Sequence, residues 1–193
     1  MPRKKTFSFK NLIHKNFRRL EQFIFLLKSL LTPRQFIYLS CVLVGISSAL
    51  AVIILKTFAH WVFKSSQKLD DILHLPFSNS TLPIIGIIIT VIIIKKVLDG
   101  SIEKGTSQIM YAVAKKRGIM PRKQMFAHII TSSFTVGMGG SAGLESPITI
   151  TGAAFGSNYA QNYRLSYKDR TLLLACGVAA GIGAAFNAPI AGV

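Results

Sequence analysis

Acidic residues are scarce in this sequence, which has 7 Asp and Glu among its 193 residues against 23 Lys and Arg. Cysteine is scarcer still, and Cys41 and Cys176 both lie in apolar stretches with neither metal-ligand nor disulfide spacing. The histidines are dispersed along the chain, at His14, His60, His74 and His128. No nucleophile–base pair or metal-ligand cluster emerges from these residues, so the sequence predicts no enzyme, no catalytic residue, no metal site and no cofactor.

Charged residues of both signs are also few. They make up 16% of the chain, whereas a soluble domain typically has about 25%. Half of the residues are hydrophobic and the mean hydropathy is +0.45. No ordinary signal peptide is visible, because the first apolar run, "FIFLLKSLL", contains Lys28 and is too short to span a bilayer. The composition therefore predicts an integral membrane protein in a lipid bilayer.

The net charge of +16 is gathered in clusters that flank the apolar runs. Such positive-inside clusters are typical of multi-pass proteins. No nucleic-acid-binding motif or aromatic-interleaved basic face accompanies them, so nucleic acid is not a predicted partner. We expect residues 1–34 to form a basic cytoplasmic arm with an amphipathic helix over residues 19–31, lying on the cell (inner) membrane. Residues 115–123, with five cations and no acid, should be cytoplasmic too.

The apolar segments change character along residues 35–193. Residues 36–55 are uncharged and long enough for one crossing, at about 1.5 Å per residue. Lys56 interrupts the uncharged run, and "FAHWVF", which contains Trp61, is expected to carry the helix into an interfacial aromatic belt. The polar residues 65–80 are expected to form an outer loop. Residues 82–94 then return across the membrane to Lys95 and Lys96. After residue 100 the segments are short and interrupted by Gly and Pro, which is typical of transporters with broken helices near the bilayer midplane.

Small residues are frequent in the last part of the chain. Gly and Ala allow membrane helices to approach closely. We therefore expect a set of small residues to build helix contacts rather than to touch a substrate: Gly152, Ala153, Ala154, Gly156, Gly177, Gly181 and Gly183.

Glu145 is a lone carboxylate in the stretch "GMGGSAGLESPITITGAAFG". Pro147 is favoured in the first turn of a helix, so a helix is predicted to start near Glu145, after a glycine-rich bend. The N–H groups of a helix start carry partial positive charge and suit an anion. An ionised Glu145 can occupy that anion site, and a protonated one can leave it. The alternative is a structural pairing of this carboxylate with a nearby lysine.

The same stretch resembles the CLC family of chloride channels and proton-coupled chloride transporters. "GLESP", Gly143 to Pro147, is similar to that family's Gly-x-Glu-x-Pro motif, whose glutamate is the gate. "GVAAGIGAAFNAPIAGV", residues 177–193, looks like the family's next conserved segment, which leads into a long helix. The resemblance implies an all-α, polytopic membrane fold with broken and re-entrant helices, of which residues 35–193 would be the first of two inverted repeats. It also implies a homodimer that moves chloride or a similar anion and, in the exchangers, protons.

A third motif departs from the family pattern. The family has Gly-Ser-Gly-Ile-Pro at the start of an earlier short helix, and its serine contacts the anion. The matching residues here are "EKGTS", with Lys104 at the serine position, Gly105 at the second glycine and Ser107 at the proline. Lys104 either lines the anion path or snorkels to the cytoplasmic surface. The resemblance implies an anion-binding set of Lys104, Gly105, Ser107, Gly143, Leu144, Glu145 and Ser146.

Two functions follow from these observations. The first is a voltage-gated-type chloride channel or chloride/proton antiporter, present here as an amino-terminal fragment. The second is a truncated, non-transporting membrane protein, or a membrane-anchored basic partner for anionic lipid. The expectation that the chain is a fragment rests on the second repeat, which would lie beyond Val193.

Overall fold

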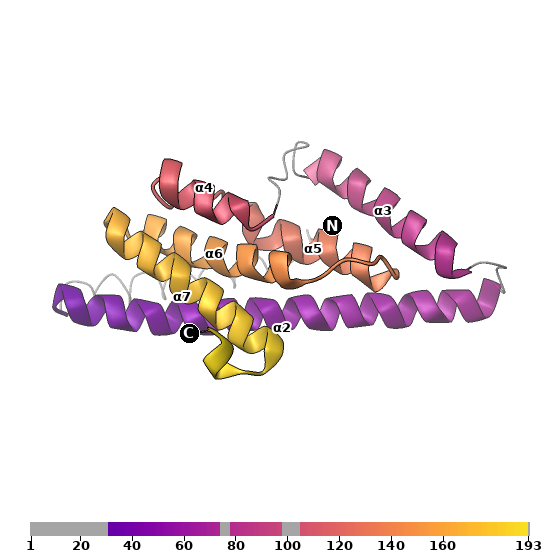
Figure 1. Ribbon diagram of the computed structural model, residues 1–193, viewed down its shortest axis with the longest axis horizontal. Coiled ribbons are helices and arrows are strands. Elements are labelled where there is room, and N and C mark those ends of the chain that lie inside the picture. The colour runs from indigo at the N-terminus through magenta and orange to yellow at the C-terminus, as the bar shows by residue number, and fades with distance from the viewer. Residues whose placement is uncertain (1–30, 74–77, 98–104, 193) are drawn as a thin grey trace, which may run out of the picture. The chain divides into compact units, whose positions relative to one another are not determined.

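The computed structural model describes residues 31–73, 78–97 and 105–192. All elements in these ranges are helical, as Figure 1 shows, which confirms the predicted all-α fold. They are α2 (Pro33–Leu73), α3 (Ser78–Val97), α4 (Ser107–Lys115), α5 (Gln124–Gly137), α6 (Glu145–Asn162), α7 (Tyr167–Phe186) and the 3-10 helix η1 (Pro189–Gly192). The basic arm and residues 19–30 of the predicted amphipathic helix lie outside the described residues.

The chain divides into two compact units, Met1–Ser40 and Cys41–Val193. Helix α2 begins in the first unit and continues into the second. The predicted boundary after residue 34 stays a prediction. The site and all packing described below belong to the second unit.

Helix α2 is longer than expected, because it runs without a break for 41 residues. Lys56 lies inside this helix, and its Nζ donates a hydrogen bond of 2.6 Å to the carbonyl oxygen of Ala185. The predicted outer loop over residues 65–80 is wrong for most of its length: α2 extends to Leu73 and α3 starts at Ser78. Ser65 and Ser66 fit a helix because each hydroxyl donates to a carbonyl one turn earlier, at Trp61 and Phe63.

Helices α6 and α7 pack at backbone contact through their glycines. A Cβ at Gly152 would collide with the Gly177 carbonyl, and a Cβ at Gly177 with the Gly152 carbonyl. A Cβ at Gly156 would collide with the carbonyl of Leu173. Ala153 and Ala154 are fully buried in the same helix. The prediction of helix contacts is confirmed for Gly152, Gly156 and Gly177, and the reason is steric: at these positions the two backbones leave no space for a side chain.

The part of α2 from Cys41 onward packs against α7. Successive residues of α2 contact successive residues of α7. Gly45 faces Ala180, Val52 faces Gly181, and Lys56 reaches Ala185. Cys41 and Cys176 lie beside each other at the start of this series. The sequence had placed the two cysteines in separate apolar stretches, and the parallel alignment of α2 and α7 brings them together.

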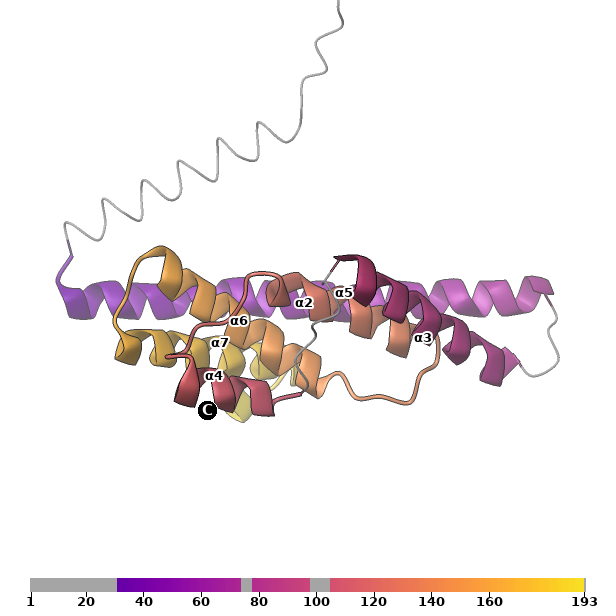
Figure 2. The same ribbon diagram turned by 90° about the horizontal axis from the view of Figure 1, so that it is seen from above.

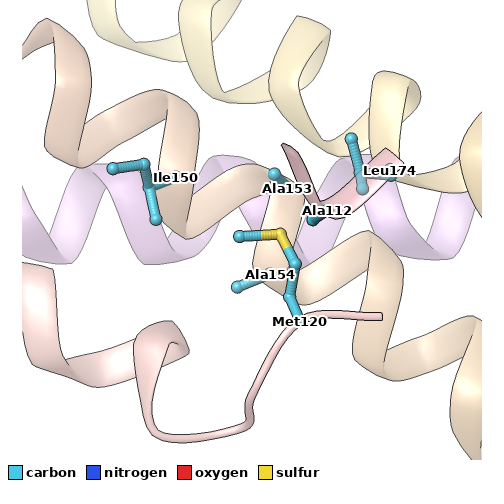
Figure 3. Packing of buried hydrophobic residues seen from close by; sticks show 6 residues of the cluster. All are labelled: Ala112, Met120, Ile150, Ala153, Ala154 and Leu174. Atoms are coloured by element: carbon cyan, nitrogen blue, oxygen red, sulfur yellow. The ribbon is translucent and has the colours of Figure 1, made fainter. Parts of the chain in front are cut away.

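A cluster of buried side chains connects α4, α6, α7 and the connection between α4 and α5. It consists of Ala112, Met120, Ile150, Ala153, Ala154 and Leu174 (Figure 3). Met120 lies outside the helices and is 1% exposed, so it anchors its loop in the core. Short α4 is thereby held against α6 although nine residues could not form a stable helix alone.

Two of the helices are long and apolar enough to cross a membrane: Pro33–Lys68 of α2, and α7. In a soluble protein such helices would be mostly buried in the core. Here 28% and 22% of their most apolar windows are buried inside the chain. Most residues of these windows are therefore not buried by the chain itself, which leaves apolar surface available for contact with lipid.

Candidate functional site

Glu145 is the first residue of α6, as the sequence predicts. The first helical hydrogen bond runs from the Ile148 N–H to the Leu144 carbonyl, at 3.0 Å. No side chain caps this helix start at Leu144, and Pro147 has no N–H. The N–H groups of Glu145 and Ser146 are thus at the positions of a helix start that lack intrahelical partners. They are available to an acceptor outside the helix.

Residues 138–144 form the bend that connects the end of α5 to the start of α6. Gly139 has φ +88°, which favours glycine. The Gly140 N–H donates to the Thr135 carbonyl at 2.9 Å, and a Cβ at Gly140 would meet that oxygen at 2.5 Å. A Cβ at Gly143 would have no other atom within 4 Å, and Gly143 is exposed.

Glu145 and the preceding Leu144 lie in different surroundings. Glu145 is exposed, while Leu144 packs against a core cluster that includes Val52 and Ile148. Among the residues that the structure describes, Glu145 has no salt-bridge partner, so the structural pairing with a lysine gains no support there. Leu144 anchors the bend by packing, and Glu145 is left as the free ionisable group at the helix start.

Helix α4 begins in a similar way, at Ser107. Gly105 has φ +71° and its carbonyl accepts from the Gln108 N–H at 3.2 Å. Thr106 occupies the cap position without a side-chain hydrogen bond to the helix. Ser107 is exposed. Lys104 lies outside the described residues, so its predicted place beside the anion remains untested.

The starts of α4 and α6 lie next to each other in both views (Figure 1, Figure 2). The packing agrees, because Ala112 of α4 belongs to the same buried cluster as Ile150 of α6. Two uncapped helix starts close together concentrate the partial positive charge of their N–H groups. The structure therefore places the start of α4, whose first residue is Ser107, beside the start of α6, whose first residue is Glu145. Helix starts of this kind suit an anion.

Residues 85–193, more than half of the chain, match the model of the family described as voltage gated chloride channel. The chain belongs to this family. The matched range contains both helix starts and the whole of α4 to α7. As a member of the family it is a membrane protein, in agreement with the two helices that are long and apolar enough to cross a membrane.

Two curated relatives are similar to part of this member of the family. A ClcB-like chloride channel protein of Ralstonia nicotianae is 38% identical over 93 residues, which are 46% of this chain and 22% of the relative. Chloride channel protein CLC-c of Arabidopsis thaliana is 38% identical over 88 residues, covering 39% of this chain and 11% of the relative. The match thus spans about a fifth or less of each relative. No solved structure matches the chain.

Sequence reasoning missed two features near the end of α7. Residues 177–193 are not one continuous element: α7 ends at Phe186, Asn187 adopts the left-handed conformation with φ +52°, and η1 follows. An open cleft of about 630 Å³ lies at this break, lined by Ala49, Ala179, Ala180, Gly183, Ala184, Asn187, Pro189 and Gly192. Asparagine tolerates the left-handed conformation at a helix end, and a proline one or two residues later is common there. Asn187 and Pro189 could therefore have predicted the end of α7 from the sequence.

Proposed function

We propose that this chain forms the anion-binding half of a chloride channel or chloride/proton antiporter, with Glu145 as the gate. The observation that carries the proposal is the position of Glu145 as an exposed carboxylate on an uncapped helix start beside a second such start. A permeating anion and the ionised carboxylate would compete for the same N–H groups. Protonation of Glu145 removes its negative charge and frees these donors for the anion.

The family match and the names of the relatives support anion passage over an enzymatic role. Chloride or a similar anion is the proposed transported species, and a homodimer in the lipid bilayer is the proposed assembly. No cofactor is proposed. One measurement distinguishes a channel from an antiporter. An imposed chloride gradient drives proton movement across the membrane through an antiporter but not through a channel.

Replacing Glu145 by glutamine should remove the pH dependence of anion efflux. Glutamine has the shape of the protonated carboxyl and cannot ionise, so the path should be open at both pH 4.5 and pH 7.5. Chloride efflux from liposomes is measured for the full product of the reading frame that contains this sequence, and for its Glu145→Gln variant.

The matched control for this experiment is Asp169→Asn. Asp169 is a carboxylate at the start of α7 that hydrogen-bonds to Ser166, so its loss changes the net charge equally without touching the proposed gate. It should leave the pH profile unchanged. Efflux by Glu145→Gln that still rises on acidification would contradict the gating role. The absence of any efflux from the parent protein would favour the non-transporting alternative.

We also propose a multi-pass topology in the cell (inner) membrane, with the amino terminus and residues 115–123 in the cytoplasm. A single cysteine at Lys115 should resist an impermeant thiol reagent added outside intact cells, and one at Ser65, near the other end of the α2 span, should react. Both are made in a chain in which Cys41 and Cys176 are alanine. Rapid external labelling at position 115 would refute the orientation.

A further inference from the structure

Two connections at one end of the second unit are joined into a single surface. One is the connection between α4 and α5, and the other is the turn between α6 and α7. Arg170 donates from Nη1 to the Arg117 carbonyl at 3.0 Å. Gln161 donates from Nε2 to the Met120 carbonyl at 3.1 Å, and Arg122 hydrogen-bonds to Asn162. Residues about 40 to 50 positions apart in the chain therefore form one contiguous face.

This face carries all eight Lys and Arg residues of the range 105–192. Arg170 is half-buried under it, and the other seven are exposed. We call these seven the basic surface: Lys115, Lys116, Arg117, Arg122, Lys123, Arg164 and Lys168. Asp169 is the carboxylate nearest to these cations in the sequence, and it accepts a hydrogen bond of 2.7 Å from the Ser166 hydroxyl. The surface is strongly positive with one local acid, and that acid has a structural partner.

The backbone beneath the basic surface is fixed by buried bonds. The Ser157 hydroxyl is fully buried, donates to the Gly118 carbonyl at 2.6 Å and accepts from the Met120 N–H at 3.0 Å. Arg117 and Gly118 both have positive φ, at 51° and 71°. The cations thus project from a held turn rather than from a loose loop, which lowers the conformational entropy lost on binding an anionic ligand.

Apolar side chains are exposed among the cations. Ile119, two residues after Arg117, is 44% exposed, and Tyr111 and Tyr167 are 51% and 47% exposed. Tyr167 is the first residue of α7, one of the two helices able to span a membrane. The basic surface therefore lies at the level where α7 meets the bilayer boundary, and amphipathic tyrosines are enriched at that depth.

We propose that the basic surface binds the phosphate headgroups of anionic phospholipids, with Ile119, Tyr111 and Tyr167 contacting the glycerol and upper acyl region. Cations close to a membrane surface attract anionic lipid, each by about fivefold in affinity. The exposed apolar side chains distinguish this ligand from a free anion, which would have no use for them. This role is separate from anion passage at Glu145 and does not require it.

The test removes four cations whose side chains make no hydrogen bond to the rest of the described chain: Lys115→Gln, Arg117→Asn, Arg164→Asn and Lys168→Gln in one protein. Asparagine is chosen at positions 117 and 164 because both have φ near +50°. The matched control also removes four exposed cations, by Lys64→Gln, Lys68→Gln, Lys95→Gln and Lys96→Gln. Both proteins lose the same net charge.

Lipid binding is measured in neutral detergent micelles by titrating phosphatidylglycerol or phosphatidylcholine and counting bound lipid by native mass spectrometry. The parent protein should retain phosphatidylglycerol over phosphatidylcholine. The basic-surface variant should lose at least tenfold in affinity for phosphatidylglycerol, while the control stays within twofold. An equal loss in both variants would overturn the proposal, because attraction would then follow net charge alone.

Two competition arms identify the ligand. Millimolar inorganic phosphate should not displace phosphatidylglycerol, and displacement would mean a free-anion site instead. A micromolar RNA oligonucleotide should not displace it either, and displacement would mean a site for a polyanionic macromolecule. If circular dichroism shows that the fourfold variant is unfolded, the doubles Lys115→Gln/Lys168→Gln and Lys95→Gln/Lys96→Gln replace the pair, with an expected difference of at least fivefold.

Discussion

Replacing Gly156 by alanine should destabilise the chain by about 3 kcal/mol or more, the upper part of the range for overpacked cores. The added methyl group would collide with the Leu173 carbonyl and approach the Leu174 Cα within 2.8 Å. Neither is the end of a flexible side chain, so α6 and α7 would have to separate. Because the whole stability of a domain is about 5–15 kcal/mol, this loss is a large fraction of it.

The control for Gly156→Ala is Gly45→Ala, on α2, which also packs against α7. A Cβ at Gly45 would have Ala180 Cβ at 3.8 Å, an ordinary contact. This substitution should be neutral or stabilising by up to about 1 kcal/mol, because alanine favours the helix. Thermal unfolding in detergent, followed by circular dichroism, measures both. Similar melting temperatures for the two variants would contradict the backbone contact between α6 and α7.

Replacing Ser157 by alanine should cost about 3 kcal/mol, because one buried hydroxyl serves three partners. It donates to the Gly118 carbonyl and accepts from the Met120 N–H and from Gln161 Nε2, the last at 3.0 Å. Without it the Gly118 carbonyl and the Met120 N–H are left buried and unpaired, each at a cost of about 1–3 kcal/mol. Hydrogen exchange at the Met120 amide should accelerate more than elsewhere in the chain.

The matched control for Ser157→Ala is Ser65→Ala. The Ser65 hydroxyl makes one exposed bond to the Trp61 carbonyl, so its loss should change stability by less than about 0.5 kcal/mol. If Ser157→Ala unfolds at the same temperature as Ser65→Ala, the hydroxyl does not hold the turn beneath the basic surface.

Features with local causes could be predicted from the sequence. The start of α6 at Glu145 follows from Pro147 and the glycines before it, all within one turn of the helix start. Gly152, Gly156 and Gly177 were correctly predicted as helix contacts, because small residues let membrane helices approach closely. The predicted anion-binding roles of Gly143 and Ser146 stay predictions.

Features with distant causes could not be predicted. Lys56 looked like the end of a crossing because a cation in an apolar run is expensive, and its acceptor on Ala185 is invisible in the local sequence. The polar stretch after Trp61 looked like a loop because Ser, Asp and Lys are frequent in loops, whereas Ser65 and Ser66 bond back to their own helix. The joining of the two basic connections also depends on contacts between distant residues, such as Arg170 with Arg117.

The hydrogen bond between Lys56 and Ala185 cannot form until some time after Lys56 has been synthesised. The two residues are 129 positions apart, and at about 5–20 residues per second the acceptor follows the lysine by about 6 to 26 s. An unpaired lysine at the centre of a membrane helix costs about 2.5–3.5 kcal/mol. We expect α2 to keep Lys56 in contact with water or lipid headgroups during that interval. We expect it to reach its final depth in the bilayer only after α7 has been made and its Ala185 carbonyl can accept the hydrogen bond.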